Sequence, residues 1–174
     1  MSMGYTTDFR GEFNVTPTLK LEHLNYLIKF SETRRVKRNL KLCFNLPDPI
    51  REATGLPVGK EGAYFVGGTG DFGQDRDSSI IDYNKPPIGQ PGLWCQWTPS
   101  KDGKQIAWDE GEKFSYYIEW IKYLIDNFLT RWEYQLNGEV RWFGEERDDL
   151  GIIIIENNNV RSDKGKITYA CKNE

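Results

Sequence analysis

The sequence predicts an α+β fold: a single domain, residues 1–174, in which two main helices pack on one face of a mainly antiparallel sheet. Segments that alternate apolar and polar residues, the pattern of strands with one buried face, lie in blocks along the chain. Two longer segments repeat apolar residues every three or four positions, as helices do. Blocks of strands with few helices favour α+β over a doubly wound fold.

The N-terminal part predicts a strand followed by a helix. From Tyr5 to Val15, apolar and polar residues alternate, which predicts a half-buried strand. Thr16-Pro17-Thr18 then offers a helix start, and apolar residues at helical spacing predict a helix near residues 20–36. This helix ends in the basic run 33–38, whose charges suit the negative pole of a helix dipole.

The middle of the chain predicts loops and short strands. Residues 45–62 contain three prolines and three glycines and indicate a loop, and residues 84–92 indicate another. Between and after them lie four strand candidates bounded by Gly, Pro and Asp: Ala63–Val66, Ser79–Tyr83, Leu93–Thr98 and Lys104–Trp108.

The C-terminal part predicts the second helix and the last strands. The helix is expected from Gly111, because seven apolar residues form one stripe: Phe114, Tyr117, Ile118, Ile121, Leu124, Ile125 and Phe128. Three strands are expected after it, at Tyr134–Phe143, Gly151–Glu156 and Lys166–Ala170, with a turn at residues 157–159.

Charge and cysteine content restrict the function classes. The net charge of −3 argues against a broad attraction for nucleic acid. The cysteines Cys43, Cys95 and Cys171 are odd in number and lack C-x-x-C spacing, which argues against a disulfide framework or a zinc site and fits a reducing cytoplasm. The longest aliphatic run, Ile152 to Ile155, is far too short to cross a membrane, and the N-terminus lacks an apolar signal region. We expect a cytoplasmic protein without a membrane partner.

The stretch from Ala63 to Gly73 contains G-x-G-x-x-G and ends in D-F-G, which raises the question of a nucleotide site. A dinucleotide fingerprint needs a helix after its third glycine, but Gly73 is followed by polar residues, a β-rich segment and a double proline. The Walker lysine and the kinase catalytic loop are absent as well. We therefore predict no nucleotide cofactor and interpret the glycines as a tightly turned or mobile loop.

Metal and catalytic signatures are also weak. The acidic residues from Asp71 to Asp82 do not have calcium-loop spacing, and His23 is the only histidine. A single histidine excludes multi-histidine metal sites and acid–base pairs of two histidines. Cys95, on a predicted strand, is better interpreted as a buried structural thiol. The sequence assigns no metal, no cofactor and no catalytic residue.

Aromatic residues are the most informative feature. Trp94 and Trp97 are predicted on opposite faces of one strand, so only one of them can join a given surface. Tyr116, Trp120 and Tyr123 form a second aromatic line on the predicted helix, beside its core stripe. This line indicates either a wide core or a contact surface. Arg34 and Arg35 of the basic run indicate either a solvated helix end or a docking site for an acidic face or phosphate.

Four segments distinguish this sequence: M-G-Y-T-T-D-F, T-R-R-V-K-R-N, D-Y-N-K-P-P-I-G-Q-P-G-L-W-C-Q-W and L-N-G-E-V-R-W-F-G-E. Through them the chain resembles, from Met3 to about Val160, a family of small uncharacterised proteins of bacterial and phage genomes, with P-G-L-W-C-Q-W as the most specific part. The resemblance implies a compact intracellular domain sometimes carried by mobile elements, and assigns no catalytic residues.

Three hypotheses follow. The leading one is a non-enzymatic protein-binding or modulator factor, such as a phage anti-defence inhibitor, with Trp94, Trp97, Trp120 and Tyr116 as apolar anchors and Arg34 and Arg35 as charged contacts. The second is a small-molecule binder or enzyme with a pocket under the loop Gly67–Asp77, where Gln74, Asp75, Asp82 and Gln96 supply polar contacts. The third is a homodimer joined through the aromatic face.

Overall fold

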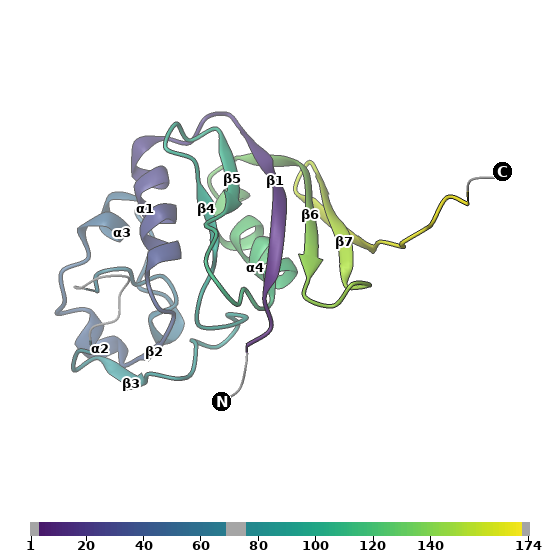
Figure 1. Cartoon of the computed structure of the whole chain (residues 1–174). Coiled ribbons are helices and arrows are strands. Elements are labelled where there is room, and N and C mark those ends of the chain that lie inside the picture. The colour runs from purple at the N-terminus through teal and green to yellow at the C-terminus, as the bar shows by residue number, and fades with distance from the viewer. Residues whose placement is uncertain (1–3, 69–75, 172–174) are drawn as a thin grey trace.

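The computed structural model describes residues 4–68 and 76–171 and confirms the predicted α+β fold (Figure 1). Its main sheet has six antiparallel strands in the order β4-β5-β1-β6-β7-β8, and a small second sheet pairs β2 with β3. The strands are β1 (Thr7–Thr16), β2 (Lys37–Arg38), β3 (Ile80–Asp82), β4 (Trp97–Pro99), β5 (Gln105–Trp108), β6 (Gln135–Gly144), β7 (Leu150–Glu156) and β8 (Asn159–Lys164).

The pair β1 and β6 forms the centre of the sheet. The strands align without interruption from Thr7 opposite Gly144 to Thr16 opposite Gln135. Phe9, Phe13 and Val15 of β1 are buried, while most residues between them are exposed. Burying each of these side chains stabilises the folded state by about 1.5 to 3 kcal/mol. Because buried and exposed residues alternate, only one face of β1 belongs to the core.

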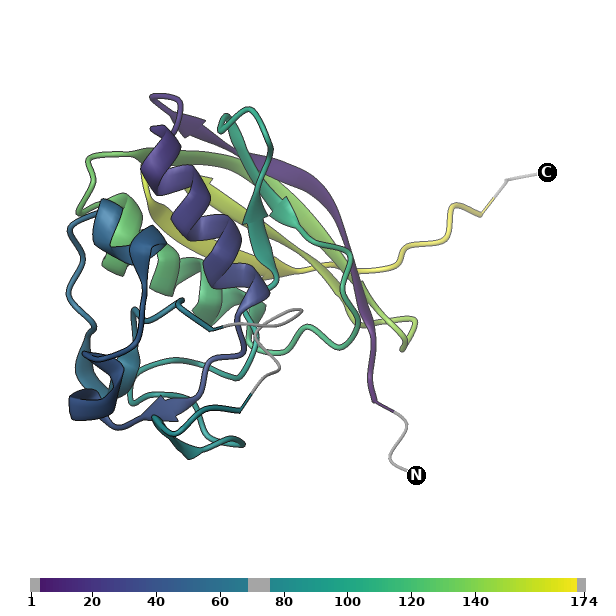
Figure 2. The same cartoon turned by 90° about the vertical axis from the view of Figure 1, so that its left-hand side faces the viewer.

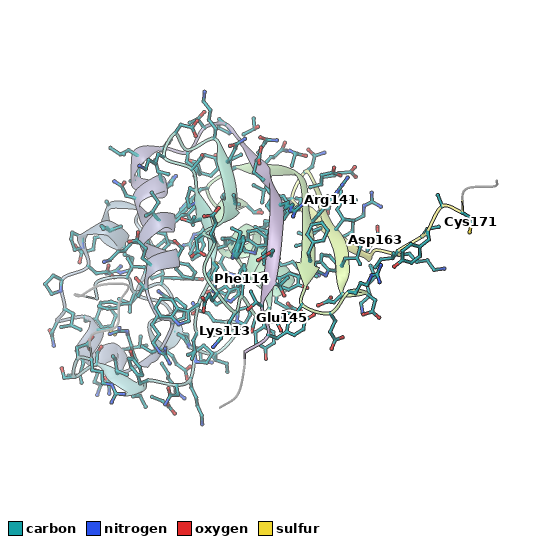
Figure 3. The ribbon with its side chains drawn as sticks, viewed as in Figure 1. Lys113, Phe114, Arg141, Glu145, Asp163 and Cys171 are labelled. Carbon is teal, nitrogen blue, oxygen red and sulfur yellow. The ribbon has the colours of Figure 1, made fainter. Side chains whose placement is uncertain are left out.

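The opposite face of the sheet is exposed to solvent. Figure 3 shows Arg141 and Asp163, which lie on β6 and β8 with β7 between them, and both side chains are exposed. A sheet with one covered face needs helices on that face alone, which is the arrangement that the alternating strand patterns predicted.

Two main helices cover the buried face, as predicted. They are α1 (Leu21–Glu32) and α4 (Tyr117–Leu124), and α4 continues into a π-helical turn, η3 (Ile125–Leu129). Figure 2 shows α1 and α4 on the same side of the sheet. Both contribute to one core, which includes Tyr26, Leu27 and Phe30 of α1, Trp120, Ile121 and Leu124 of α4, and Phe13, Trp97, Ile106, Leu136, Val140 and Ile153 of the sheet.

The first helix is shorter than predicted. It ends at Glu32, and Thr33 is extended, with its Oγ1 donating to the carbonyl of Lys29 at 2.6 Å. The basic run 33–38 therefore begins at the C-cap of the helix instead of forming its last turn, and Lys37 and Arg38 form β2. The interaction of these charges with the helix dipole stays a prediction.

The second helix also begins later than predicted, at Tyr117 rather than near Gly111. Tyr116 precedes it in the left-handed conformation, with φ of 58°. Phe114 is nevertheless buried against Phe9 and Trp97. The predicted apolar stripe extended beyond the helix because Phe114, in the turn before α4, is buried in the same core as the helix.

Two predictions for irregular regions need correction. Ala63–Val66 is not a strand but follows a 3-10 turn, η1 (Lys60–Gly62), with the Phe65 amide donating to the Gly62 carbonyl at 3.0 Å. The predicted loop 45–62 contains a short helix, α3 (Pro49–Ala53), and α2 (Leu40–Cys43) lies just before it. In these segments the backbone N–H and C=O groups form hydrogen bonds within local turns and short helices, and they do not pair with a neighbouring strand.

The last predicted strand, Lys166–Ala170, is also wrong. The chain turns at Asn157 and Asn158, which have φ of 48° and 67°, and the final strand is β8. The predicted turn at residues 157–159 is thus present, and it returns the chain early enough for β8 to pair with β7. Residues 165–171 are exposed and lead away from the body of the protein, with Cys171 on this segment (Figures 1 and 3).

Candidate functional site

A groove of about 810 Å³ lies beside α4. One wall is formed by the start of α4 and by η3, and the other by residues 60–64 and 88–91. Its lining combines three tyrosines, a small set of amide and apolar groups, and charged residues of both signs: Lys60, Ala63, Tyr64, Ile88, Gly89, Gln90, Pro91, Tyr116, Glu119, Lys122, Tyr123, Asp126 and Asn127.

Exposed apolar groups mark the mouth of the groove. Tyr116 is 58 % exposed and Ile88 is 62 % exposed, although both are large apolar side chains. Lys60, Glu119, Lys122 and Asp126 are exposed as well, so charges surround an apolar and aromatic interior. This pattern resembles a protein interface, in which a desolvated centre is bounded by a polar rim.

The floor of the groove is formed by the side chain of Gln90 and its partners. Gln90 is 7 % exposed, and its Nε2 donates to the Ala63 carbonyl at 2.6 Å and to the Tyr123 hydroxyl at 3.0 Å. Its Oε1 accepts from Arg35 Nε at 3.3 Å. The amide is therefore held on both sides and connects the groove to the interior.

Arg35 lies behind this floor and is 1 % exposed. Besides Gln90, it donates to the Phe65 carbonyl at 3.0 Å and to the Ala63 carbonyl at 2.7 Å, and its guanidinium lies 4.3 Å from the centre of the Phe30 ring. Burial lowers the pKa of Arg35. It forms no ion pair with any described residue, so its acceptors are neutral oxygens only.

Two of the three tyrosines of the groove, Tyr64 and Tyr123, are held by hydrogen bonds. Tyr64 Oη donates to Asn127 Oδ1 at 3.1 Å, and Asn127 Nδ2 donates to the Tyr123 carbonyl at 3.0 Å. Burial raises the pKa of Tyr123, although the hydrogen bond from Gln90 and the charge of Arg35 oppose it. Tyr123 is therefore a neutral phenol at physiological pH.

Trp120 lies one helical turn from Tyr123 and is fully buried. Its Nε1 has no hydrogen-bond partner among the residues that the structure describes. A Cβ atom built on Gly92 would lie 3.7 Å from this nitrogen and 3.3 Å from the Tyr116 ring. Gly92 thus lies against both the unpaired donor and the side chain of Tyr116.

Three predicted contact residues lie in the interior. Trp97 and Arg35 are each 1 % exposed and Trp120 is fully buried. The Trp97 ring packs against Phe9, and its Nε1 donates to the Tyr117 carbonyl at 2.8 Å. None of the three side chains can reach a partner without rearrangement of the core, so their interpretation as a contact surface is corrected.

The other predicted anchors lie nearer the surface. Tyr116 lines the groove, whereas Trp94 is half-buried and precedes β4, so the two tryptophans do not share one strand. Arg34 is outside the groove; its Nε donates to the Tyr83 carbonyl at 3.0 Å, and its guanidinium lies 4.3 Å from the centre of the Tyr83 ring.

The polar contacts predicted for the second hypothesis are not brought together. Gln96 is buried, with its amide donating to the Glu112 carbonyl at 2.8 Å and accepting from Trp108 Nε1 at 3.1 Å. Asp82 is at the end of β3 and accepts from the Asn84 amide at 2.9 Å. Gln74 and Asp75 lie outside the described residues.

A smaller hollow of about 260 Å³ lies where the predicted loop pocket begins, next to Gly67 and Gly68. Asp48 lines it and is 1 % exposed, and burial raises the pKa of its carboxyl. One oxygen accepts from Arg51 Nε at 2.7 Å, while Oδ1 has no partner among the described residues. This carboxylate was not among the predicted site residues.

No protein-family model, curated protein or solved structure matches this chain. Within the described ranges, no helix combines the length and the apolar character that a membrane crossing requires. In the same part of the chain, no three His, Cys, Asp or Glu side chains gather in a way that could hold a metal ion.

The single histidine provides a prediction on pH. The His23 ring is stacked on Trp132 with centroids 4.0 Å apart, and its Nδ1 lies 2.7 Å from Tyr134 Oη. Burial lowers the pKa of His23 from its usual 6.5, with Glu22 opposing and Lys20 assisting. Because the unfolded chain binds the proton more readily, the free energy of unfolding is expected to decrease as the pH falls below about 6.5.

Urea unfolding measured in steps from pH 8 to pH 5 checks this expectation. The variant His23→Gln is the control, because it has no imidazole to titrate. A decrease of the same size in both proteins would show that His23 is not responsible.

Proposed function

We propose that this protein is a non-enzymatic binding protein whose groove beside α4 receives a short segment of a protein partner. The observation that carries the proposal is the exposure of Tyr116 and Ile88 at the mouth of a groove of about 810 Å³. Large apolar groups left in water beside a hollow are typical of surfaces that a partner covers.

The distribution of charge supports binding over catalysis. Glu119, Lys122 and Asp126 are exposed and surround the groove. Solvated charges of mixed sign select among partners and orient them, but contribute little as acids or bases. The amides of Gln90 and Asn127 are fixed by hydrogen bonds to Tyr123 and so hold the aromatic lining of the groove in place.

The cellular setting is part of the proposal. The resemblance to proteins of bacterial and phage genomes fits a modulator that acts on a host or rival protein inside the cell. The free thiols of Cys43 and Cys95, both buried, are compatible with a reducing cytoplasm. A small-molecule site remains the alternative; the unpaired, buried Oδ1 of Asp48 beside the smaller hollow is the observation that favours it.

Photo-crosslinking in the native host tests the proposal. The photoreactive residue p-benzoylphenylalanine replaces Tyr116 at the groove, and in a matched control it replaces Phe143, which is 36 % exposed on the outer face of the sheet. We expect one discrete adduct from position 116, and we expect Ile88→Asp to reduce its yield about tenfold, because a charge at the apolar mouth must be desolvated.

The Phe143 control decides the location of the contact. An adduct at position 143 with none at position 116 would place the contact on the open face of the sheet and contradict the proposal. An adduct at position 116 that is insensitive to Ile88→Asp would show that the groove is not the contact.

A further inference from the structure

We infer that the groove recognises a carboxylate on the bound segment, and that the hydroxyl of Tyr123 is the donor that binds it. Gln90 and Arg35 orient this donor and strengthen it. This inference rests on the proposed function, because it names the chemistry recognised in the same groove. The observations that carry it are a buried cation without a carboxylate partner and a chain of hydrogen bonds from that cation to the groove.

The first step concerns the charge of Arg35. A buried cation is costly to desolvate unless an anion compensates it. Its acceptors are the carbonyls of Ala63 and Phe65 and the amide oxygen of Gln90, all of them neutral. The positive potential of the guanidinium is therefore only partly offset, and in this low-dielectric region an anion in the adjoining groove is stabilised.

The second step concerns the direction of the hydrogen bonds. Gln90 Oε1 must accept, because Arg35 has donors only. Its Nε2 consequently faces the Ala63 carbonyl and the Tyr123 hydroxyl, and it donates to both. A flipped amide would place its N–H groups against Arg35 Nε–H and its oxygen against the Ala63 carbonyl. The hydrogen bonds therefore run outward from Arg35 through Gln90 to Tyr123.

The third step concerns the phenol. Tyr123 Oη accepts from Gln90, which leaves its own hydrogen available, and no acceptor for that hydrogen is found within the described residues. Because burial raises its pKa, the phenol keeps this proton. Hydrogen bonds in a chain polarise one another, so a phenol that accepts from a cation-linked amide donates more strongly.

The groove also limits the kind of anion. The guanidinium acts through one amide and offers the groove no bidentate contact, which a phosphate dianion would favour. Glu119 and Asp126 at the rim are balanced by Lys60 and Lys122, so the rim supplies no net positive charge to compensate a dianion. Tyr64, Tyr116 and Ile88 provide apolar contact on either side. The fitting ligand is a monoanionic carboxylate next to an apolar or aromatic side chain.

A titration followed by ¹H–¹⁵N NMR tests the inference with two matched probes. N-acetyl-L-phenylalanine carries the carboxylate, and N-acetyl-L-phenylalaninamide replaces it with a neutral amide. We expect the acid to bind about tenfold more tightly, since hydrogen bonds to charged groups exceed neutral ones by about that factor. The side-chain amide of Gln90 and the indole N–H of Trp120 should shift.

Two hydroxyl deletions in the same groove provide the control. Tyr123→Phe is expected to abolish the preference for the acid, whereas Tyr64→Phe, whose hydroxyl donates to Asn127 instead, is expected to retain it. Both changes remove one oxygen and no ring, and the dispersion of the amide spectrum reports whether each variant is folded. Loss of preference in both variants would show a general effect on the groove and overturn the role of Tyr123.

The remaining outcomes separate this inference from the proposed function. Equal affinity for acid and amide, or no shift with either, overturns carboxylate recognition, and a crosslink at position 116 would still support the groove. Stronger binding of inorganic phosphate overturns the preference for a monoanion. The dipeptide N-acetyl-Phe-Asp-amide distinguishes the source, because it binds only if a side-chain carboxylate suffices, whereas N-acetyl-L-phenylalanine presents a chain-terminal one.

Discussion

Replacing Trp97 by alanine is expected to lower the free energy of unfolding by about 3 to 5 kcal/mol, the range observed when a large buried aromatic is removed. The ring is 1 % exposed and lies 5.5 Å from the Phe13 ring and 5.3 Å from the Phe114 ring, measured between centroids. The substitution leaves a cavity between the sheet and α4, and it also removes the indole N–H that donates to the Tyr117 carbonyl. Urea unfolding followed by circular dichroism measures the change.

Trp94→Ala is the matched control for this prediction. Trp94 is half-buried and precedes the strand that holds Trp97, so its loss is expected to cost less than about 1 kcal/mol. Losses of equal size in the two variants would contradict the assignment of Trp97 alone to the core.

Replacing Arg35 by alanine is expected to lower the free energy of unfolding by about 3 kcal/mol or more, because several costs add. The Phe65 carbonyl and Gln90 Oε1 lose a donor in a buried region. The guanidinium no longer lies over the Phe30 ring. The alanine variant no longer buries a cation, and the desolvation cost that it avoids offsets part of this loss. The acceptors without a donor and the cavity remain.

Arg35→Lys separates the charge from the geometry. Lysine keeps the cation but cannot serve three acceptors with a planar fork, so a loss between those of the wild type and Arg35→Ala is expected. Thermal or urea unfolding of the three proteins provides the comparison. A lysine variant as stable as the wild type would show that the fork is not needed, and that the charge alone holds residues 63–65.

Only part of the groove was identifiable from the sequence. Tyr116 was predicted as a contact and Tyr123 belonged to the same aromatic line, because helical spacing places them near one another. Gln90 and Tyr64 were not identified. The only sequence signal near Gln90 is its position in the proline-rich loop 84–92, and such loops often carry function, but this does not specify a partner.

The sequence by itself determined the class of fold and the long strands β1, β6 and β7. These follow from the spacing of apolar residues, which is a local property of the chain. Lys166–Ala170 shows the limit of such patterns, because alternation describes a strand that could pair, and pairing needs an adjacent strand.

Only the tertiary structure decided which aromatic and basic residues meet water. Trp120 is in the core while Tyr116 is at the surface, and Arg35 is buried while Arg34 lies on Tyr83. The groove likewise combines residues 60–64, 88–91 and 116–127. Its floor depends on hydrogen bonds between segments far apart in the chain, and no local pattern of residues encodes such contacts.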